Sequence, residues 1–151
     1  MLFYKRGFTL IELLVVIGII AVLSGVVIIA INPARQFAQA RDTQRTSSVR
    51  AILDAIGQRM ADNQGVFEIG CSAGVIPTST QVYIASSSYH IAPCIIPTYI
   101  STLPIDPSDA NARFINVNDY DTGFTIQRSS STNRVTVAAP SAELNPISIT
   151  R

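Results

Sequence analysis

The sequence predicts an α+β fold in which a long N-terminal helix packs by its second half on a small antiparallel sheet. Three observations support this fold class. Residues 13–31 form an apolar run without a charged side chain. Apolar residues then recur at spacings of three and four as far as Met60, as on one face of an amphipathic helix. After Gly65, short alternating stretches are separated by Gly, Pro and Ser, which is typical of strands and turns.

The apolar run is long enough to cross a membrane, because a helix of about 20 apolar residues spans the hydrocarbon core. We therefore predict a transmembrane and assembly helix over residues 8–32. Lys5 and Arg6 precede it, and the positive-inside rule places them in the cytoplasm and the rest of the chain outside. No small-residue cleavage site of the secretory type follows the run, so we expect the helix to stay in the mature protein.

Glu12 is a carboxylate near the start of this apolar segment. Ionisable side chains inside a membrane are costly, and they are usually paired and functional. We expect that Glu12 has a specific cationic partner. The alternative is that it lies at the interface level of a plain signal anchor, where water hydrates it.

Residues 7–12, with the sequence GFTLIE, resemble the processing site of type IV pilins and of the related pseudopilins of type II secretion systems. In that family a membrane peptidase cuts after the glycine and the same enzyme methylates the new amino terminus. The resemblance implies that residues 1–7 are a leader, that Gly7 is its last residue and that Phe8 becomes the N-methylated first residue. Glu12 is then the fifth residue of the mature chain.

Cleavage after Gly7 would create an ammonium group at Phe8, four residues before Glu12. The two groups are close enough to pair on one helix. Between neighbouring subunits the same pair would neutralise two charges inside hydrocarbon and would set the axial stagger of one helix on the next. Loss of one partner would leave the other charge buried and unpaired, which is strongly destabilising.

Residues 33–64 are predicted to be the amphipathic half of the same helix, with a kink at Pro33. A stop signal follows at residues 62–65. The apolar stripe expected to bury against the sheet consists of Val49, Ile52, Leu53, Ile56 and Met60. The arginines of this region are interpreted as a solvated helix face or as inter-subunit ion pairs, since nucleic-acid binding would need a denser basic patch with aromatic neighbours. They are Arg35, Arg41, Arg45, Arg50 and Arg59.

Residues 65–151 are predicted to form a small globular head. We predict strands over residues 81–85, 112–117, 123–128 and 134–139, with turns at residues 118–123 and 129–133. The segment LPIDP at residues 103–107 resembles one found in many pseudopilins and small bacterial pilins, and its prolines make a stiff lead into the sheet. Residues 140–151 show no clear pattern and are expected to run along the surface.

Cys71 and Cys94 are predicted to lie on the outer side of the membrane, where thiols tend to oxidise. A disulfide between them would contribute about 3 kcal/mol in the chain-entropy model. Two free buried thiols are the alternative. Metal binding by this pair is not expected, because no nearby Cys or His completes a ligand set.

The head offers little for catalysis, so we expect no enzyme activity and no cofactor. Its one histidine, His90, lies in a Ser-rich loop without a Gly-x-Ser-x-Gly elbow, and no pattern places a nucleophile for a catalytic triad with it. No phosphate-binding glycine loop is present. Calcium sites occur near this region in some pseudopilin relatives, but the loop lacks the glycine and the closing glutamate of an EF-hand, and turn formation also explains its side chains. The candidate oxygen ligands are Asp106, Asp109, Asn111, Asn118, Asp119 and Asp121.

The resemblance and the residues together predict a structural subunit of a type IV pilus-like filament, processed after Gly7 and assembled through its apolar helix. The first alternative is a pseudopilin of a type II secretion or DNA-uptake machine, and the second is a bitopic anchor that does not polymerise. Expected partners are identical or homologous pilin subunits, the prepilin peptidase and methylase, the assembly ATPase and platform, and the membrane; nucleic acid is not expected. The precursor should span the inner membrane once, and the filament should be extracellular or periplasmic.

Overall fold

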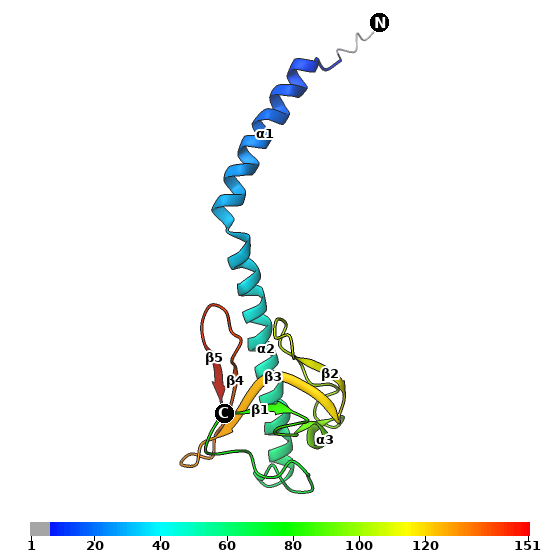
Figure 1. The fold of residues 1–151 in the computed structure, drawn as a ribbon, viewed down its shortest axis with the longest axis vertical. Coiled ribbons are helices and arrows are strands. Elements are labelled where there is room, and N and C mark those ends of the chain that lie inside the picture. Colours follow the sequence, from blue (N-terminus) through cyan, green and yellow to red (C-terminus); the bar gives the residue numbers. More distant parts are fainter. Residues whose placement is uncertain (1–6) are drawn as a thin grey trace, which may run out of the picture. The chain divides into compact units, whose positions relative to one another are not determined.

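The computed structural model describes residues 7–151, so Lys5, Arg6 and the rest of the predicted leader up to residue 6 lie outside the described residues. The chain divides into two compact units, the first ending at Phe37 and the second, the C-terminal unit, comprising Ala38–Arg151. Two long helices begin the chain: α1 (Leu10–Ile31) and α2 (Pro33–Asp62) (Figure 1).

Asn32 separates the two helices. It has a left-handed conformation, with φ 48° and ψ 77°, and caps the end of α1. Its carbonyl and side-chain oxygens accept hydrogen bonds from the N–H of Arg35, at 3.1 and 3.4 Å, and so start α2. Pro33 then occupies the first helical position, where its missing N–H costs nothing. The helical hydrogen bonding is therefore interrupted at the Asn-Pro pair.

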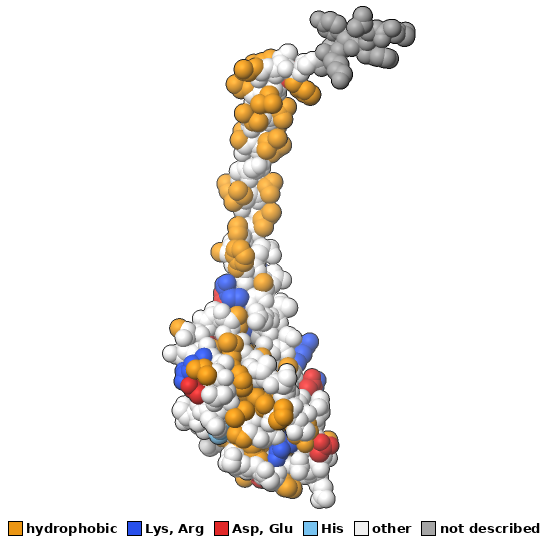
Figure 2. Space-filling model, turned by 90° about the vertical axis from the view of Figure 1, so that its right-hand side faces the viewer, with side chains coloured by type: hydrophobic (Ala, Val, Ile, Leu, Met, Phe, Trp, Pro, Cys, Tyr) orange, Lys and Arg blue, Asp and Glu red, His pale blue; other side chains and the backbone are white. Residues whose placement is uncertain are grey.

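No residue of α1 is buried within the chain, and Figure 2 shows hydrophobic side chains along the whole helix. A helix that is apolar on all sides needs a membrane or other helices around it. Among the described residues, α1 is the one helix that is long and apolar enough to cross a membrane.

The C-terminal unit contains a five-stranded antiparallel sheet, which confirms the predicted α+β fold. Strands β3 (Asp119–Arg128), β4 (Val135–Ala139) and β5 (Ile147–Thr150) form a meander, and β1 (Val82–Ala85) pairs with the other edge of β3. The short strand β2 (Arg113–Asn116) forms a hairpin with the first residues of β3, on the same edge as β4. The short helix α3 (Ala92–Ile95) lies between β1 and β2 in the chain.

Two expectations for the head are wrong. β3 begins at Asp119, so most of the turn predicted at residues 118–123 is strand, and Gly123 takes a positive φ of 73° within it. The tail after residue 140 does not simply run along the surface, because Ile147 and Ile149 pair with Ala139 and Val137 and form β5. Both isoleucines are partly buried against the core, and this contact orders the last strand.

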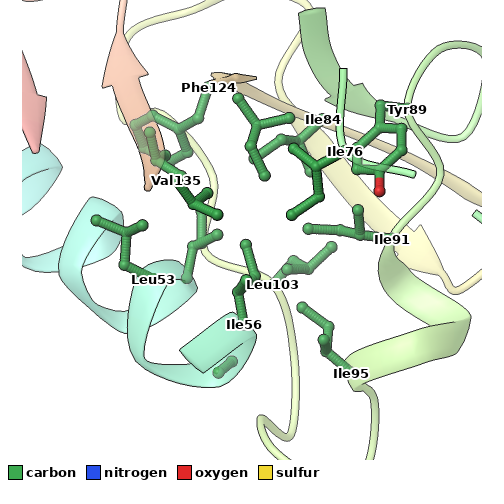
Figure 3. Close-up of a cluster of buried hydrophobic side chains, with 14 of the residues drawn as sticks. Leu53, Ile56, Ile76, Ile84, Tyr89, Ile91, Ile95, Leu103, Phe124 and Val135 are labelled. Atoms are coloured by element: carbon green, nitrogen blue, oxygen red, sulfur yellow. The ribbon is translucent and has the colours of Figure 1, made fainter. Parts of the chain in front are cut away.

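The core lies between the sheet and the part of α2 that belongs to the C-terminal unit (Figure 3). The predicted stripe is buried as expected at Val49, Ile52, Leu53 and Ile56, whereas Met60 is only partly buried. Isoleucines from the loops, α3 and β1 complete the cluster, and each fully buried aliphatic side chain contributes about 1.5–3 kcal/mol. They are Ile76, Ile84, Ile91 and Ile95.

The loop after α2 is held to α3 by two cross-links. Cys71 and Cys94 form a disulfide, with their Cα atoms 5.3 Å apart. The buried guanidinium of Arg59 donates hydrogen bonds to the carbonyl oxygens of Phe67, Ile69 and Cys94, at 2.8, 2.6 and 2.7 Å. The interpretation of Arg59 as part of a solvated helix face is therefore wrong. Its guanidinium instead supplies hydrogen bonds to carbonyl groups of a loop that does not pair with the sheet.

A second buried arginine ties α2 to two loops. Arg45 is fully buried and binds the buried carboxylate of Asp106 through two hydrogen bonds of 2.8 and 3.0 Å. The same guanidinium also contacts Asp42, Ser108 and Glu143. We call these five residues the Arg45 cluster. The prediction of a solvated or inter-subunit role is wrong for Arg45 as well, since its partners come from α2, from residues 106–108 and from the β4–β5 loop of the same chain.

Hydrogen bonds in the Arg45 cluster hold its carboxylates ionised. Bonds from Arg41 and then Arg45 lower the pKa of Glu143 to about 2. Burial opposes ionisation of Asp106, but the bonds from Arg45 and from the backbone N–H groups of Ser108 and Asp109 outweigh it and lower its pKa. Burial also opposes ionisation of Asp42, and bonds from two backbone N–H groups and from Arg45 lower its pKa.

These lowered pKa values predict how the stability of the C-terminal unit depends on pH. A carboxyl whose pKa is lower in the folded than in the unfolded chain stabilises the fold above its unfolded pKa, and this contribution is lost as the pH falls through the folded value. We therefore expect the free energy of unfolding to be steady above about pH 5 and to fall towards about pH 2. The free energy of unfolding can be measured across this pH range by urea titrations monitored with circular dichroism. Glu143→Gln should reduce the slope, and stability that rises on acidification would contradict the assignment.

Candidate processing and assembly site

The site predicted at the N-terminus is built on the first turn of α1. Thr9 caps the helix in an extended conformation, and its Oγ accepts a hydrogen bond from the N–H of Glu12 at 3.3 Å. In return, Oε2 of Glu12 accepts hydrogen bonds from the N–H and from the hydroxyl of Thr9, both at 2.8 Å. Together these contacts form a reciprocal capping box.

The capping box fixes the position of the one charged side chain in α1. The first N–H groups of a helix lack partners within it, and their dipoles favour a negative charge nearby. The carboxylate of Glu12 therefore lies against the start of the helix, one turn from Phe8. All of its hydrogen bonds within the described residues go to Oε2, and none of the ion pairs in this part of the chain involves it.

Gly7 and Phe8 precede the helix and are accessible. Phe8 is 89% exposed, and no atom of the described chain lies within 4 Å of the place where a side chain on Gly7 would begin. The peptide bond between them is outside regular secondary structure. An uncovered bond outside regular secondary structure is accessible to a peptidase, and cutting it would leave a new amino group next to the capping box.

The capping box is a feature that our sequence reasoning missed. Its signal was present, since Thr9-x-x-Glu12 before an apolar run is the usual pattern of a helix start. We expected Glu12 to pair with the amino group of Phe8, on its own helix or on a neighbouring one, whereas the structure pairs it with Thr9 at the start of its own helix.

The candidate calcium ligands in the head do not meet at one point. Asp106 binds Arg45, and Asp119 forms an exposed ion pair with Arg113 at 2.9 Å. The carboxylates of Asp109 and Asp121 accept hydrogen bonds from backbone N–H groups two residues further on. Over residues 7–151, no cluster of three His, Cys, Asp or Glu side chains is arranged to hold a metal ion.

His90 lies against the aromatic ring of Tyr120. The two rings stack with centroids 5.5 Å apart, and Nδ1 of His90 is 3.2 Å from the hydroxyl oxygen of Tyr120. That hydroxyl oxygen also accepts a hydrogen bond from the N–H of Ala92 at 3.1 Å. The contacts of His90 therefore serve the packing of β3 against α3.

Comparison with known proteins identifies the N-terminal segment. Residues 2–28 match the model of the prokaryotic N-terminal methylation motif, which is the prepilin-type motif of type IV pilins and pseudopilins. No curated protein and no solved structure matches the chain. The motif lies over the capping box and most of α1, so the chain has a prepilin-type N-terminus on a helix that is long and apolar enough to cross a membrane.

Proposed function

We propose that the chain is a structural subunit of a type IV pilus-like filament. The precursor is cut after Gly7, methylated at Phe8, and moved from the membrane into a bundle held together by its apolar helices. The observation that carries this proposal is the position of the methylation motif, which lies on a helix with no buried residue and with Glu12 as its single charge. Such a helix has no packing partner within residues 7–151, and copies of itself supply one.

In this proposal Glu12 receives the amino group of Phe8 from a neighbouring copy. Its Oε2 is occupied by Thr9, while Oε1 takes no hydrogen bond within the described residues. That oxygen is thus left for an ammonium group, and charge-assisted hydrogen bonds of this type are the stronger ones. Because α1 contains no other charge, the pair has one favourable register along the helix.

A pseudopilin of a type II secretion or DNA-uptake machine is the second candidate. It is favoured by the LPIDP segment at residues 103–107, whose Asp106 is the buried partner of Arg45. Abundance separates the two candidates, since a major pilin dominates filaments sheared from the cell surface and a pseudopilin remains with the membrane. The third candidate, a bitopic anchor, predicts no dependence of its location on Glu12.

The first test is intact-mass and N-terminal peptide mass spectrometry of sheared and membrane fractions. We expect a chain that begins at methylated Phe8 in the sheared fraction, and a Gly7→Leu precursor that keeps its leader because the larger side chain blocks the cut. Gly57→Ala, a glycine change in α2 outside the motif, is the matched control and should be processed normally. A wild-type chain that keeps Met1 in mature membranes, or normal cutting of Gly7→Leu, would refute the assignment.

A further inference from the structure

The C-terminal unit has an apolar groove at one edge of its sheet. The groove has a volume of ≈ 310 Å³ and lies between α2 and the start of β4. Leu53, Ile56 and Met60 line it from the helix, and Val135 lines it from the strand, with Arg134 at its rim. Its volume is at the lower end of the range of about 300–1,000 Å³ found for protein binding pockets, so it is a candidate site for an apolar side chain of a partner.

Gly57 forms part of the groove wall. A Cβ at this position would have no atom within 4 Å, so the space above the helix is open there. Glycine in the middle of a helix is unfavourable compared with any ordinary residue, and neither a turn nor a close contact within the described chain requires it. Its effect in this structure is to keep the groove open.

The β2–β3 hairpin carries an apolar side chain that could fill such a groove. Ile115 is 65% exposed, which is the largest exposure of a large hydrophobic residue in the C-terminal unit. Its neighbour Phe114 points to the core, where its ring lies 6.0 Å from that of Tyr120. The strand register shifts between Phe114 and Asn116, so Ile115 lies at a β-bulge, and its exposure shows that it projects away from the core.

The groove and the hairpin are separate surfaces of the C-terminal unit and differ in charge. β2 pairs with the first residues of β3, β4 pairs with the last residues of β3 on the same edge, and the groove lies between β4 and α2. Residues 107–121 around the hairpin contain three aspartates and one arginine. The charged residues that line the groove are Arg134 and Arg151, of which Arg151 pairs with Asp54. Complementary charge of this kind favours one orientation of association.

We propose that the groove beside Gly57 binds the Ile115 hairpin of a second copy of this chain. The contact joins two different surfaces, so it is heterologous and each copy keeps one free groove and one free hairpin. Such contacts do not close into a dimer but continue from copy to copy. This inference rests on the proposed function and assigns the surfaces through which neighbouring heads meet.

The first test fills the groove. Gly57→Leu introduces a side chain into space that the chain's own atoms do not use, and it replaces glycine with a better helix former. We expect the head to resist protease at least as well as the wild type, while the amount of subunit in sheared filaments falls by roughly tenfold, as expected for loss of an apolar anchor at an interface. Gly57→Ala is the matched control and should assemble normally. Wild-type amounts of filament from Gly57→Leu would overturn the inference.

The second test joins the two surfaces directly. The full-length double variant Gly57→Cys/Ile115→Cys, oxidised in native membranes and filaments, should give a ladder of several covalently joined copies, whereas either single variant should not extend beyond a dimer. The pair Gly57→Cys/Val75→Cys, which uses another exposed apolar residue of the head, is the control and should give no ladder. Filaments without a ladder would refute this surface and leave the proposed function standing. A ladder in membranes of cells that make no filaments would refute the proposed function and retain the surface.

Discussion

Glu12→Gln is expected to abolish or strongly slow filament assembly without changing the folded head. Glutamine keeps the hydrogen bonds of the capping box, because its side-chain oxygen can accept from the N–H of Thr9 as Oε2 does now. It cannot neutralise the amino group of Phe8 from a neighbouring copy, which would then be buried unpaired in hydrocarbon. We expect the sheared filament fraction to fall by at least roughly tenfold, since one order of magnitude corresponds to only about 1.4 kcal/mol.

Glu12→Ala separates the two roles of this residue. It removes both the charge and the cap, so the difference between the alanine and glutamine variants reports the capping box alone. If assembly depends on charge, the two variants fail to a similar extent. If glutamine assembles like the wild type and only alanine fails, the carboxylate matters as a helix cap and the register role is wrong. Immunoblots of sheared and membrane fractions, with equal precursor processing as the control, provide the measurement.

The elements whose sequence pattern extends over many residues could be predicted from the sequence. The apolar run and the stripe through Val49, Ile52 and Ile56 repeat over many residues, and both became helices with the expected exposure. Strands β3 and β4 were located because Phe124 and Ile126, and likewise Val135 and Val137, alternate with polar residues and face the core. Because such a pattern repeats over a whole helix or strand, a single unusual residue does not change the prediction made from it.

The missed features are short or depend on contacts between distant residues. Helix α3 has only four residues, and β5 shows a single alternation of Ile147 and Ile149. The roles of Arg45 and Arg59 were misjudged because an arginine on a polar helix normally faces water. Arg45 binds Asp106, and Arg59 binds carbonyl groups of the segments that the Cys71–Cys94 disulfide joins. These partners lie largely in loops, whose sequences show no regular spacing of apolar residues. The capping box was readable and was overlooked, whereas these buried arginines required the fold itself.

Arg45→Met is expected to destabilise the C-terminal unit by about 3 kcal/mol or more, because removing one partner of a buried ion pair leaves the other charge uncompensated. Asp106 is the charge left behind, with its side chain fully buried and its strongest partner gone. A domain of this size is stable by only about 5–15 kcal/mol, so the variant should unfold early in urea and reach filaments poorly. Urea unfolding of the full-length protein in detergent, followed by near-ultraviolet circular dichroism of its tyrosines, measures the change.

Two further variants show whether burial of the charge is the cause. Arg113→Met breaks the Arg113–Asp119 pair, whose side chains are 55% and 45% exposed, and exposed pairs contribute only about 0–1 kcal/mol. The double variant Arg45→Met/Asp106→Leu removes both charges of the buried pair and should recover part of the stability lost by Arg45→Met, since apolar residues often replace buried ion pairs without loss. An Arg45→Met protein as stable as Arg113→Met would show that water reaches Asp106 and that the Arg45 cluster does not hold the two loops to α2.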